Sequence, residues 1–110
     1  MPRRYVPDAG DIVWLKFTPH AGHEQAGHRP ALVLSPASYN DKTSLAVCCP
    51  LTKQIKNYPF EVLIGGSPPR VILADQVKSL DWRSRNARRK GRVTAEQLAE
   101  VRAKVRALIG

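Results

Sequence analysis

Residues 11–17 read Asp-Ile-Val-Trp-Leu-Lys-Phe, and this stretch decides the fold class. In a strand, its even positions from Ile12 to Lys16 point to one face and its odd positions from Val13 to Phe17 to the other. β-branched, aromatic and aliphatic side chains dominate both sets, which favours a strand over a helix. Because both faces carry apolar side chains, we expect a central strand of a sheet or a strand of a barrel.

Four short apolar runs follow this strand, each next to proline, glycine or turn residues. They span residues 31–34, 44–49, 60–64 and 71–74. Tyr39 to Lys42 supplies turn chemistry between the first two runs, and Pro50 predicts a strand end or a bulge beside Thr52. The even spacing without intervening helices predicts a small antiparallel barrel or sandwich.

The C-terminus changes to a helical period. Residues 94–97, Thr-Ala-Glu-Gln, form a capping-box pattern that predicts a helix start. An apolar stripe then recurs at helical spacing, and it consists of Leu98, Val101, Val105 and Leu108. We expect this amphipathic helix to pack on the barrel or on a partner subunit, with Arg102, Lys104 and Arg106 outside.

Size and composition predict one domain that spans residues 1–110. The chain has 110 residues, of which 43% are hydrophobic and 25% charged, as in ordinary globular proteins. Its 18 basic residues exceed its 9 acidic ones and leave a net charge of +9, which favours an anionic partner. No apolar run approaches the ~20 residues of a membrane span, and the basic N-terminus leads into no secretory segment, so we expect a cytoplasmic protein without membrane contact.

The two cysteines, Cys48 and Cys49, are adjacent within an apolar run. In a strand they point to opposite faces, which disfavours shared metal binding. We interpret them as reduced core residues, with a disulfide between neighbours as the alternative.

Chemistry-bearing side chains concentrate between Gly22 and Pro30. Glu24 is suited to accept a proton, His28 to shuttle one, and Arg29 to hold a phosphate through its planar fork. Phosphodiester chemistry needs all three capacities. Each residue also fits a plain structural role, as a solvated acid, a surface imidazole or a strand-anchoring ion pair.

The segment Glu24 to Pro30, followed by Leu34-Ser35-Pro36, resembles the signature of the MazF/PemK-type toxins of toxin–antitoxin pairs. The likeness covers essentially the whole chain in order. It continues through residues 4–8, 10–11, 50–52, 58–62, 74–79, 81–83 and 105–110.

This resemblance implies a homodimeric, SH3-like β-barrel endoribonuclease that cuts single-stranded RNA, chiefly mRNA, at a short sequence. It implies no metal and no cofactor, attack by the ribose 2′-hydroxyl on its own phosphorus, and a cyclic phosphate and a 5′-hydroxyl as ends. By motif the catalytic arginine and threonine fall on Arg29 and Thr52, and Glu24 matches the loop acid. A cognate antitoxin with an acidic C-terminal segment blocks such toxins.

The reaction needs a base for the 2′-hydroxyl, an acid for the 5′-oxygen and charge stabilisation on the phosphoryl oxygens. DNA lacks the nucleophile and should resist. Arg29 suits charge stabilisation, because a guanidinium pKa above roughly 12 makes a poor base. Glu24 is then the easier base and His28 or His23 the easier acid, since imidazole titrates near neutral pH. Whether Arg29 also transfers protons stays open.

Sequence choice would come from contacts to unstacked bases, for which Gln25, Gln54 and Gln76 are candidates. Lys53 adds positive charge nearby. A second basic segment spans residues 78–92 and includes Arg88 and Arg89, and it predicts salt-sensitive phosphate contacts or a surface for the acidic antitoxin segment.

Two other functions fit the same charge. A non-catalytic toxin of this fold would inhibit a protein such as a topoisomerase, and would need neither Arg29 nor Thr52 as a phosphate site. An RNA-binding module would stack bases on aromatic residues such as Trp14, Phe17 or Trp82 and cut nothing. Core packing is the plainer role for Trp14.

Overall fold

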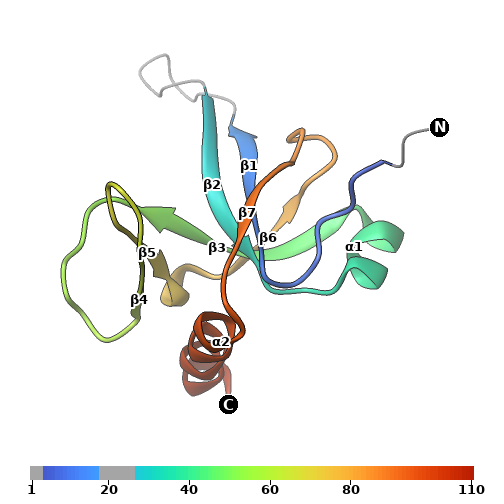
Figure 1. Cartoon of the computed structure of the whole chain (residues 1–110). Coiled ribbons are helices and arrows are strands. Elements are labelled where there is room, and N and C mark those ends of the chain that lie inside the picture. Colours follow the sequence, from blue (N-terminus) through green and yellow to red (C-terminus); the bar gives the residue numbers. More distant parts are fainter. Residues whose placement is uncertain (1–3, 18–26) are drawn as a thin grey trace, which may run out of the picture.

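The computed structural model describes residues 4–17 and 27–110. Its strands are β1 (Asp11–Phe17), β2 (Gly27–Val33), β3 (Leu45–Thr52), β4 (Glu61–Ile64), β5 (Arg70–Leu73), β6 (Lys78–Asp81) and β7 (Arg88–Arg92). Its helices are α1 (Ala37–Thr43), the 3-10 turn η1 (Ala74–Gln76) and α2 (Ala95–Ile109). Figure 1 shows the sheet curled around itself, with α2 packed across its lower side. Neither α1 nor α2 has the length and apolar character that a bilayer crossing requires.

The described strands form one antiparallel sheet in the order β4-β5-β3-β2-β1-β7, with β6 paired to β3 outside this path. The long strand β3 makes this possible. It pairs with β2 along one edge, and along the other it pairs first with β6 and then with β5. The sheet therefore curls into a half-barrel, which confirms the predicted small barrel with a C-terminal helix.

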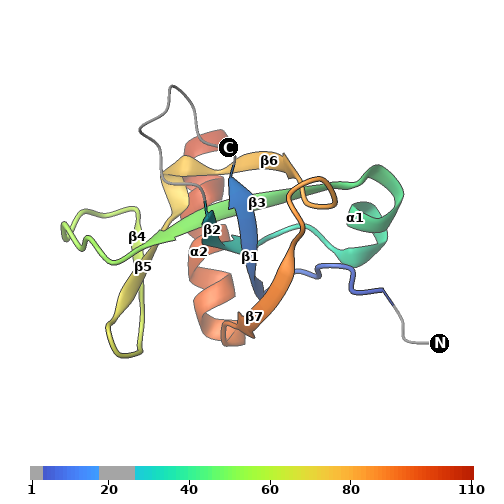
Figure 2. The same cartoon turned by 90° about the horizontal axis from the view of Figure 1, so that it is seen from above.

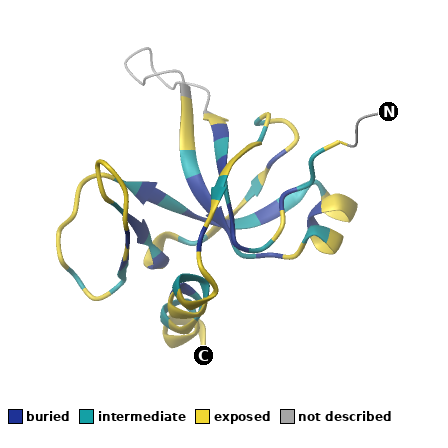
Figure 3. Cartoon of the chain, in the orientation of Figure 1, coloured by how far each residue is buried: buried dark blue, intermediate teal, exposed yellow. Residues whose placement is uncertain are grey.

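The alternation predicted for residues 11–17 is confirmed in β1, which lies between β2 and β7. Val13 and Leu15 are fully buried, whereas Trp14 is half-buried and Lys16 exposed. Core residues gather in two clusters. One surrounds Leu32, Ile72 and Val101 beneath α2, and the other surrounds Leu15, Val33 and Trp82. Figure 3 shows the buried positions lining the inside of the curled sheet.

Helix α2 begins with the predicted capping box. The Thr94 hydroxyl accepts a hydrogen bond from the Gln97 amide at 3.1 Å, and the Gln97 side chain accepts from the Thr94 amide at 2.9 Å. Val101 is fully buried, and Leu98 and Val105 pack around it. The cap satisfies two first-turn amides and contributes about 1 kcal/mol.

Leu108 of the predicted apolar stripe is exposed on this chain, so packing of the last turn on a partner subunit stays a prediction. One expectation for α2 was wrong. Arg102 and Lys104 are not outside, since they donate hydrogen bonds to the carbonyls of Leu34 and Pro59. Their long stems lie along the barrel while their charged ends reach backbone oxygens.

The turn predicted at residues 39–42 is wrong, because residues 37–43 form α1. Buried Asn40 organises this helix. Its side-chain amide donates to the carbonyls of Pro7 and Ser35, and its carbonyl oxygen accepts from the Ser35 hydroxyl at 2.6 Å. The contact with Pro7 joins residues 33 positions apart, which a local pattern does not contain.

The run predicted at residues 44–49 is longer in the structure, because β3 continues through Pro50 and ends at Thr52, where a strand end was predicted. Residues 45–48 pair with β6 and residues 51–52 pair with β5. Pro50 falls between them, where its missing N–H breaks no pairing on that edge. The sequence reading also missed β6 and β7, which arise within the basic segment at residues 78–92.

Candidate functional site

Side chains alternate along β2, and Arg29 lines a hollow of about 270 Å³ on one face of the sheet. Thr52 at the end of β3, Gln76 on η1 and Lys78 on β6 complete its polar lining. Ala31, Cys48 and Leu51 form an apolar, buried floor. We call this the Arg29 hollow. It brings a guanidinium, an ammonium, a hydroxyl and an amide together above an apolar floor.

A second hollow of about 180 Å³ continues from the first and shares Thr52 and Gln76 with it. Gln54, Lys56 and Tyr58 extend its lining. The two hollows form a groove that begins at Arg29 and is lined by amides suited to hydrogen bonding with bases.

The segment after β3 is held by hydrogen bonds. The Thr52 hydroxyl oxygen accepts from the Gln54 amide at 3.1 Å, and the Glu61 carboxylate accepts from the amides of Lys56 and Asn57. Tyr58 donates to Asp75 at 2.8 Å, and this bond raises the pKa of Tyr58. With one lone pair of Thr52 engaged, its hydroxyl proton remains available for a ligand.

The structure brings together Arg29, Thr52 and Gln76, which the sequence analysis proposed separately. Gln54 lies in the adjoining hollow, and Lys53 is exposed between them and lines neither. Glu24, His23 and Gln25 lie outside the described residues.

His28 faces away from this group. It lines a different hollow of about 250 Å³ with Trp14 and Arg88, because neighbouring residues of a strand point to opposite faces. In the sheet order β6 and β7 lie on opposite sides of the paired strands β1 and β2, and Figure 2 shows these strands from above. Among the described residues, His28 is therefore not placed beside Arg29 and Thr52, and its acid–base role stays a prediction.

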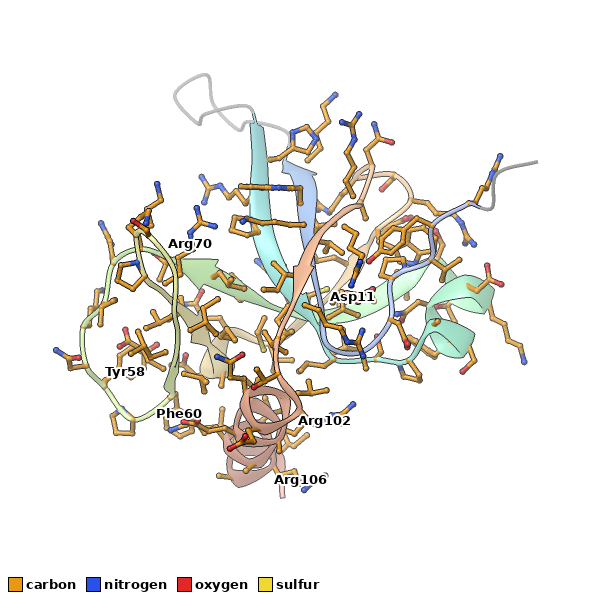
Figure 4. The ribbon with its side chains drawn as sticks, in the orientation of Figure 1. Asp11, Tyr58, Phe60, Arg70, Arg102 and Arg106 are labelled. Carbon is orange, nitrogen blue, oxygen red and sulfur yellow. The ribbon has the colours of Figure 1, made fainter. Side chains whose placement is uncertain are left out.

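The basic segment at residues 78–92 is not one continuous basic face. Arg83 pairs with Asp41 at 2.8 Å and stacks over Trp82. The buried carboxylate of Asp11 accepts from Arg92 at 2.8 Å and lies 3.7 Å from Arg89. Figure 4 places Asp11 where β1 and β7 meet.

These contacts separate the two arginines that were predicted to bind RNA. Arg89 helps close β7 onto β1 through Asp11, whereas Arg88 is exposed beside His28. RNA contact at either arginine stays a prediction. Trp82, considered above as a stacking platform, is buried and donates its indole N–H to the Asn40 carbonyl.

Residues 8–109 match the family model described as PemK-like, MazF-like toxin of type II toxin-antitoxin system. The chain is 55% identical over 111 residues to the endoribonuclease toxin MazF of Escherichia coli strain K12, with 100% of both chains covered. The chain belongs to this toxin family.

Other relatives agree with this family assignment. The endoribonuclease PemK of Escherichia coli is 35% identical over 112 residues, which cover 92% of this chain and 84% of PemK. A crystal structure of MazE-MazF from Deinococcus radiodurans matches with a TM-score of 0.89 and 54% identity, over 96% of this chain and 98% of that one. The predicted resemblance and the predicted fold are thereby confirmed.

Lys78 is the member of the Arg29 hollow that sequence reasoning did not assign to it. Lys78 pairs with Cys48 across β6 and β3, residues 30 positions apart. The sequence shows Lys78 only as one charge among many in the basic segment, so no local signal links it to Arg29 or Thr52.

Both cysteines are free and buried, as predicted. Burial raises the pKa of the Cys48 thiol to about 12, with Cys49 acting in the same direction and Lys78 opposing. Burial likewise raises the pKa of Cys49 to about 12. In this family member Cys48 is therefore a neutral part of the hollow's floor. The described residues contain no group of three or more His, Cys, Asp or Glu side chains placed to hold a metal ion.

Proposed function

We propose that the chain is an endoribonuclease toxin that cuts single-stranded RNA, chiefly mRNA, at a short sequence and without a metal. The observation that carries this proposal is the meeting of Arg29 and Thr52 in one hollow, in a chain that is 55% identical over its whole length to an endoribonuclease toxin. A hydrolytic metal site is not required, because the ribose supplies the nucleophile.

The proposed reaction is an internal transfer at phosphorus. The 2′-oxygen loses its proton to a base and bonds to phosphorus, while the bond from phosphorus to the 5′-oxygen breaks. The departing oxygen takes up a proton, which leaves a 2′,3′-cyclic phosphate and a 5′-hydroxyl. DNA has no 2′-hydroxyl and remains intact.

Arg29 stabilises the charge that develops on the phosphoryl oxygens, because its planar fork offers two parallel N–H donors. A positioned donor of this kind contributes about 3 to 4 kcal/mol to the transition state. Thr52 adds its free hydroxyl proton, and Lys78 adds a second positive charge on the same hollow.

Glu24 remains the proposed base and His23 or His28 the proposed acid. His28 faces the opposite side of β2, so its variant tests whether a group on that side takes part. Gln54 and Gln76 line the groove next to Thr52, and we assign to them hydrogen bonds with the bases at the cut. Gln25, Lys53, Arg88 and Arg89 remain proposed RNA contacts.

The proposal includes an antitoxin, a homodimer and a cytoplasmic location. Solved MazE-MazF complexes of a relative 54% identical to this chain support a protein partner, and the net charge of +9 suits an acidic segment of that partner. A homodimer and a location beside cellular mRNA agree with family membership.

The test uses purified protein with EDTA on one long single-stranded RNA and on its DNA counterpart. We expect discrete cuts in RNA, cyclic phosphate and 5′-hydroxyl ends, and intact DNA. Uncut RNA from folded, antitoxin-free protein would overturn the proposal and favour a toxin that acts by binding a protein. Cutting that stops with EDTA would overturn metal independence alone.

A further inference from the structure

Trp14 lies at the centre of a cationic hollow on the face of β2 that turns away from Arg29. Trp14 and His28 line this hollow with Arg88, and its volume is about 250 Å³. The Lys90 ammonium lies 5.2 Å and the Arg70 guanidinium 6.0 Å from the centre of the indole ring. We call this group the Trp14 hollow.

The backbone builds the Trp14 hollow in a specific way. Trp14 pairs with Pro30 of β2 on one side and with Arg88 of β7 on the other. The register between β1 and β7 shifts after Ile12, so that Lys90 is an extra residue on β7. A bulge of this kind re-aims a side chain, and here the ammonium of Lys90 lies over Trp14.

Arg70 reaches the hollow from another part of the sheet. It begins β5, and Figure 4 shows its side chain directed from the β4–β5 hairpin toward β2. Residues 31–33 of β2 pair with β3. Among the described strands, the residues of β2 before Ala31 pair with β1 alone. Arg29 of this outer edge of β2 lines one hollow and His28 lines the other, so the edge lies between the two hollows.

The Trp14 hollow is rich in positive charge without a matching acid. The described part of the chain gives none of Arg70, Arg88 and Lys90 an ion-pair partner. By contrast, neighbouring Arg89 and Arg92 are matched by Asp11. Cations held around a half-buried indole suit a ligand that carries both a negative charge and a flat ring.

We propose that the Trp14 hollow is a second RNA subsite, which binds a nucleotide flanking the cleavage site. One base stacks on or against the Trp14 indole, and the adjoining phosphates contact Arg88, Lys90 and Arg70. Aromatic platforms with a basic surround bind single strands in this way, without reading sequence. RNA that leaves the Arg29 hollow reaches this subsite across the outer edge of β2.

This inference rests on the proposed function for the identity of the ligand, and an acidic peptide is the competing occupant. A peptide carboxylate would satisfy the cations but would make no stacking contact with the half-buried ring of Trp14. A nucleotide satisfies both, and for this reason we favour RNA.

The experiment compares two RNAs that carry the mapped cut sequence with a 2′-deoxy nucleotide at the cut, which prevents cleavage. One contains the cut sequence alone, and the other adds about ten flanking nucleotides. The variant is Arg88→Gln with Lys90→Gln. Its matched control is Lys42→Gln with Arg106→Gln, which removes equal charge from exposed positions on α1 and α2.

We expect wild-type protein and the control to bind the longer RNA about ten-fold more tightly than the shorter one. The Arg88 and Lys90 variant should lose this advantage, and its salt dependence should fall by about 0.7 for each phosphate contact removed. An equal length advantage in variant and control would overturn the proposal.

Fluorescence supplies a readout specific to Trp14, since the chain has two tryptophans and Trp82 is buried. The longer RNA should quench the emission more than the shorter one, and Trp14→Phe should remove this difference while keeping an aromatic platform. Equal quenching by both RNAs would refute stacking at Trp14.

Two further outcomes separate the proposals. A poly-glutamate peptide that binds wild-type protein but not the Arg88 and Lys90 variant, with no length effect for RNA, would assign the hollow to an acidic partner instead. If the protein cuts no RNA, the proposed function fails. The binding experiment is then made with short and long RNAs of arbitrary sequence, and a length advantage that the Arg88 and Lys90 variant loses would still support an RNA subsite at Trp14.

Discussion

Replacing Arg29 with alanine tests the centre of the proposed reaction. The guanidinium lines the hollow of about 270 Å³ together with Thr52 and Lys78. Its removal deletes a charged two-donor contact to the phosphoryl oxygens and leaves the Lys78 ammonium and the Thr52 hydroxyl in place. Loss of one positioned donor costs about 3 to 4 kcal/mol, which corresponds to a fall in kcat of about 10² to 10³.

The same substitution should leave the fold nearly intact. Arg29 is exposed, whereas its neighbour Ala31 is buried in the core. Changes at exposed positions alter the free energy of unfolding by about 0.5 kcal/mol or less. Arg29→Lys keeps the charge and loses the fork, so we expect an intermediate fall in kcat of about 10 to 10².

The assay is single-turnover cleavage of a mapped RNA in EDTA, paired with thermal unfolding of each variant. Arg106→Ala is the control, because it removes the same charge from an exposed position on α2. Wild-type turnover by Arg29→Ala would refute the role of the hollow. Lost turnover with a fall in Tm of more than about 5 °C would refute the claim that Arg29 serves chemistry alone.

Four further predictions follow from the geometry. Thr52→Val keeps the shape and removes the hydroxyl donor, so single-turnover cleavage should fall by about ten-fold or more while the fold persists; unchanged rates would exclude the hydroxyl from catalysis. Asn40→Ala deletes three buried hydrogen bonds and should lower the free energy of unfolding in urea by about 3 kcal/mol, whereas a loss below about 1 kcal/mol would contradict its organising role. Thr94→Ala removes the cap of α2 and should cost about 1 kcal/mol in the same assay, with Thr94→Asp as the retaining control. Burial raises the thiol pKa of Cys48 and Cys49 from 9.0 to about 12, so the thiols of the unfolded chain ionise first as the pH rises. The free energy of unfolding should therefore be fully present below about pH 9 and decline toward pH 12. A Cys48→Ala variant should show a weaker decline in urea unfolding, and a decline equal to that of the wild type would refute the thiol as its source.

Local patterns predicted the elements whose signals lie within a few neighbouring residues. The alternation of β1 and the capping box of α2 are such signals, since a strand face and a helix cap are set over two to four positions. The likeness to the toxin family likewise rests on short motifs in order, and these motifs include Arg29 and Thr52.

Local patterns failed where a distant contact decides the structure. The segment at residues 37–43 becomes α1 around Asn40, whose amide bonds to Pro7. The basic segment yields β6 and β7 because β3 and β1 offer free edges to it, and its arginines find acids at Asp11 and Asp41. Pairing energy from a neighbouring strand exceeds a weak local preference.

By itself, the sequence determined a small β-barrel with a C-terminal helix, a basic surface and the residue types of the site. Those features depend on side-chain periodicity and on composition, which are properties of neighbouring residues. Only the tertiary structure decided which groups meet. Pairing of β3 with β2 and β6 joins Arg29, Thr52 and Lys78 in one hollow, and the two-residue period of β2 sends His28 to the opposite face. A strand's register and its partners are set by the burial of a shared core, so the identity of a site's members is a property of the whole fold.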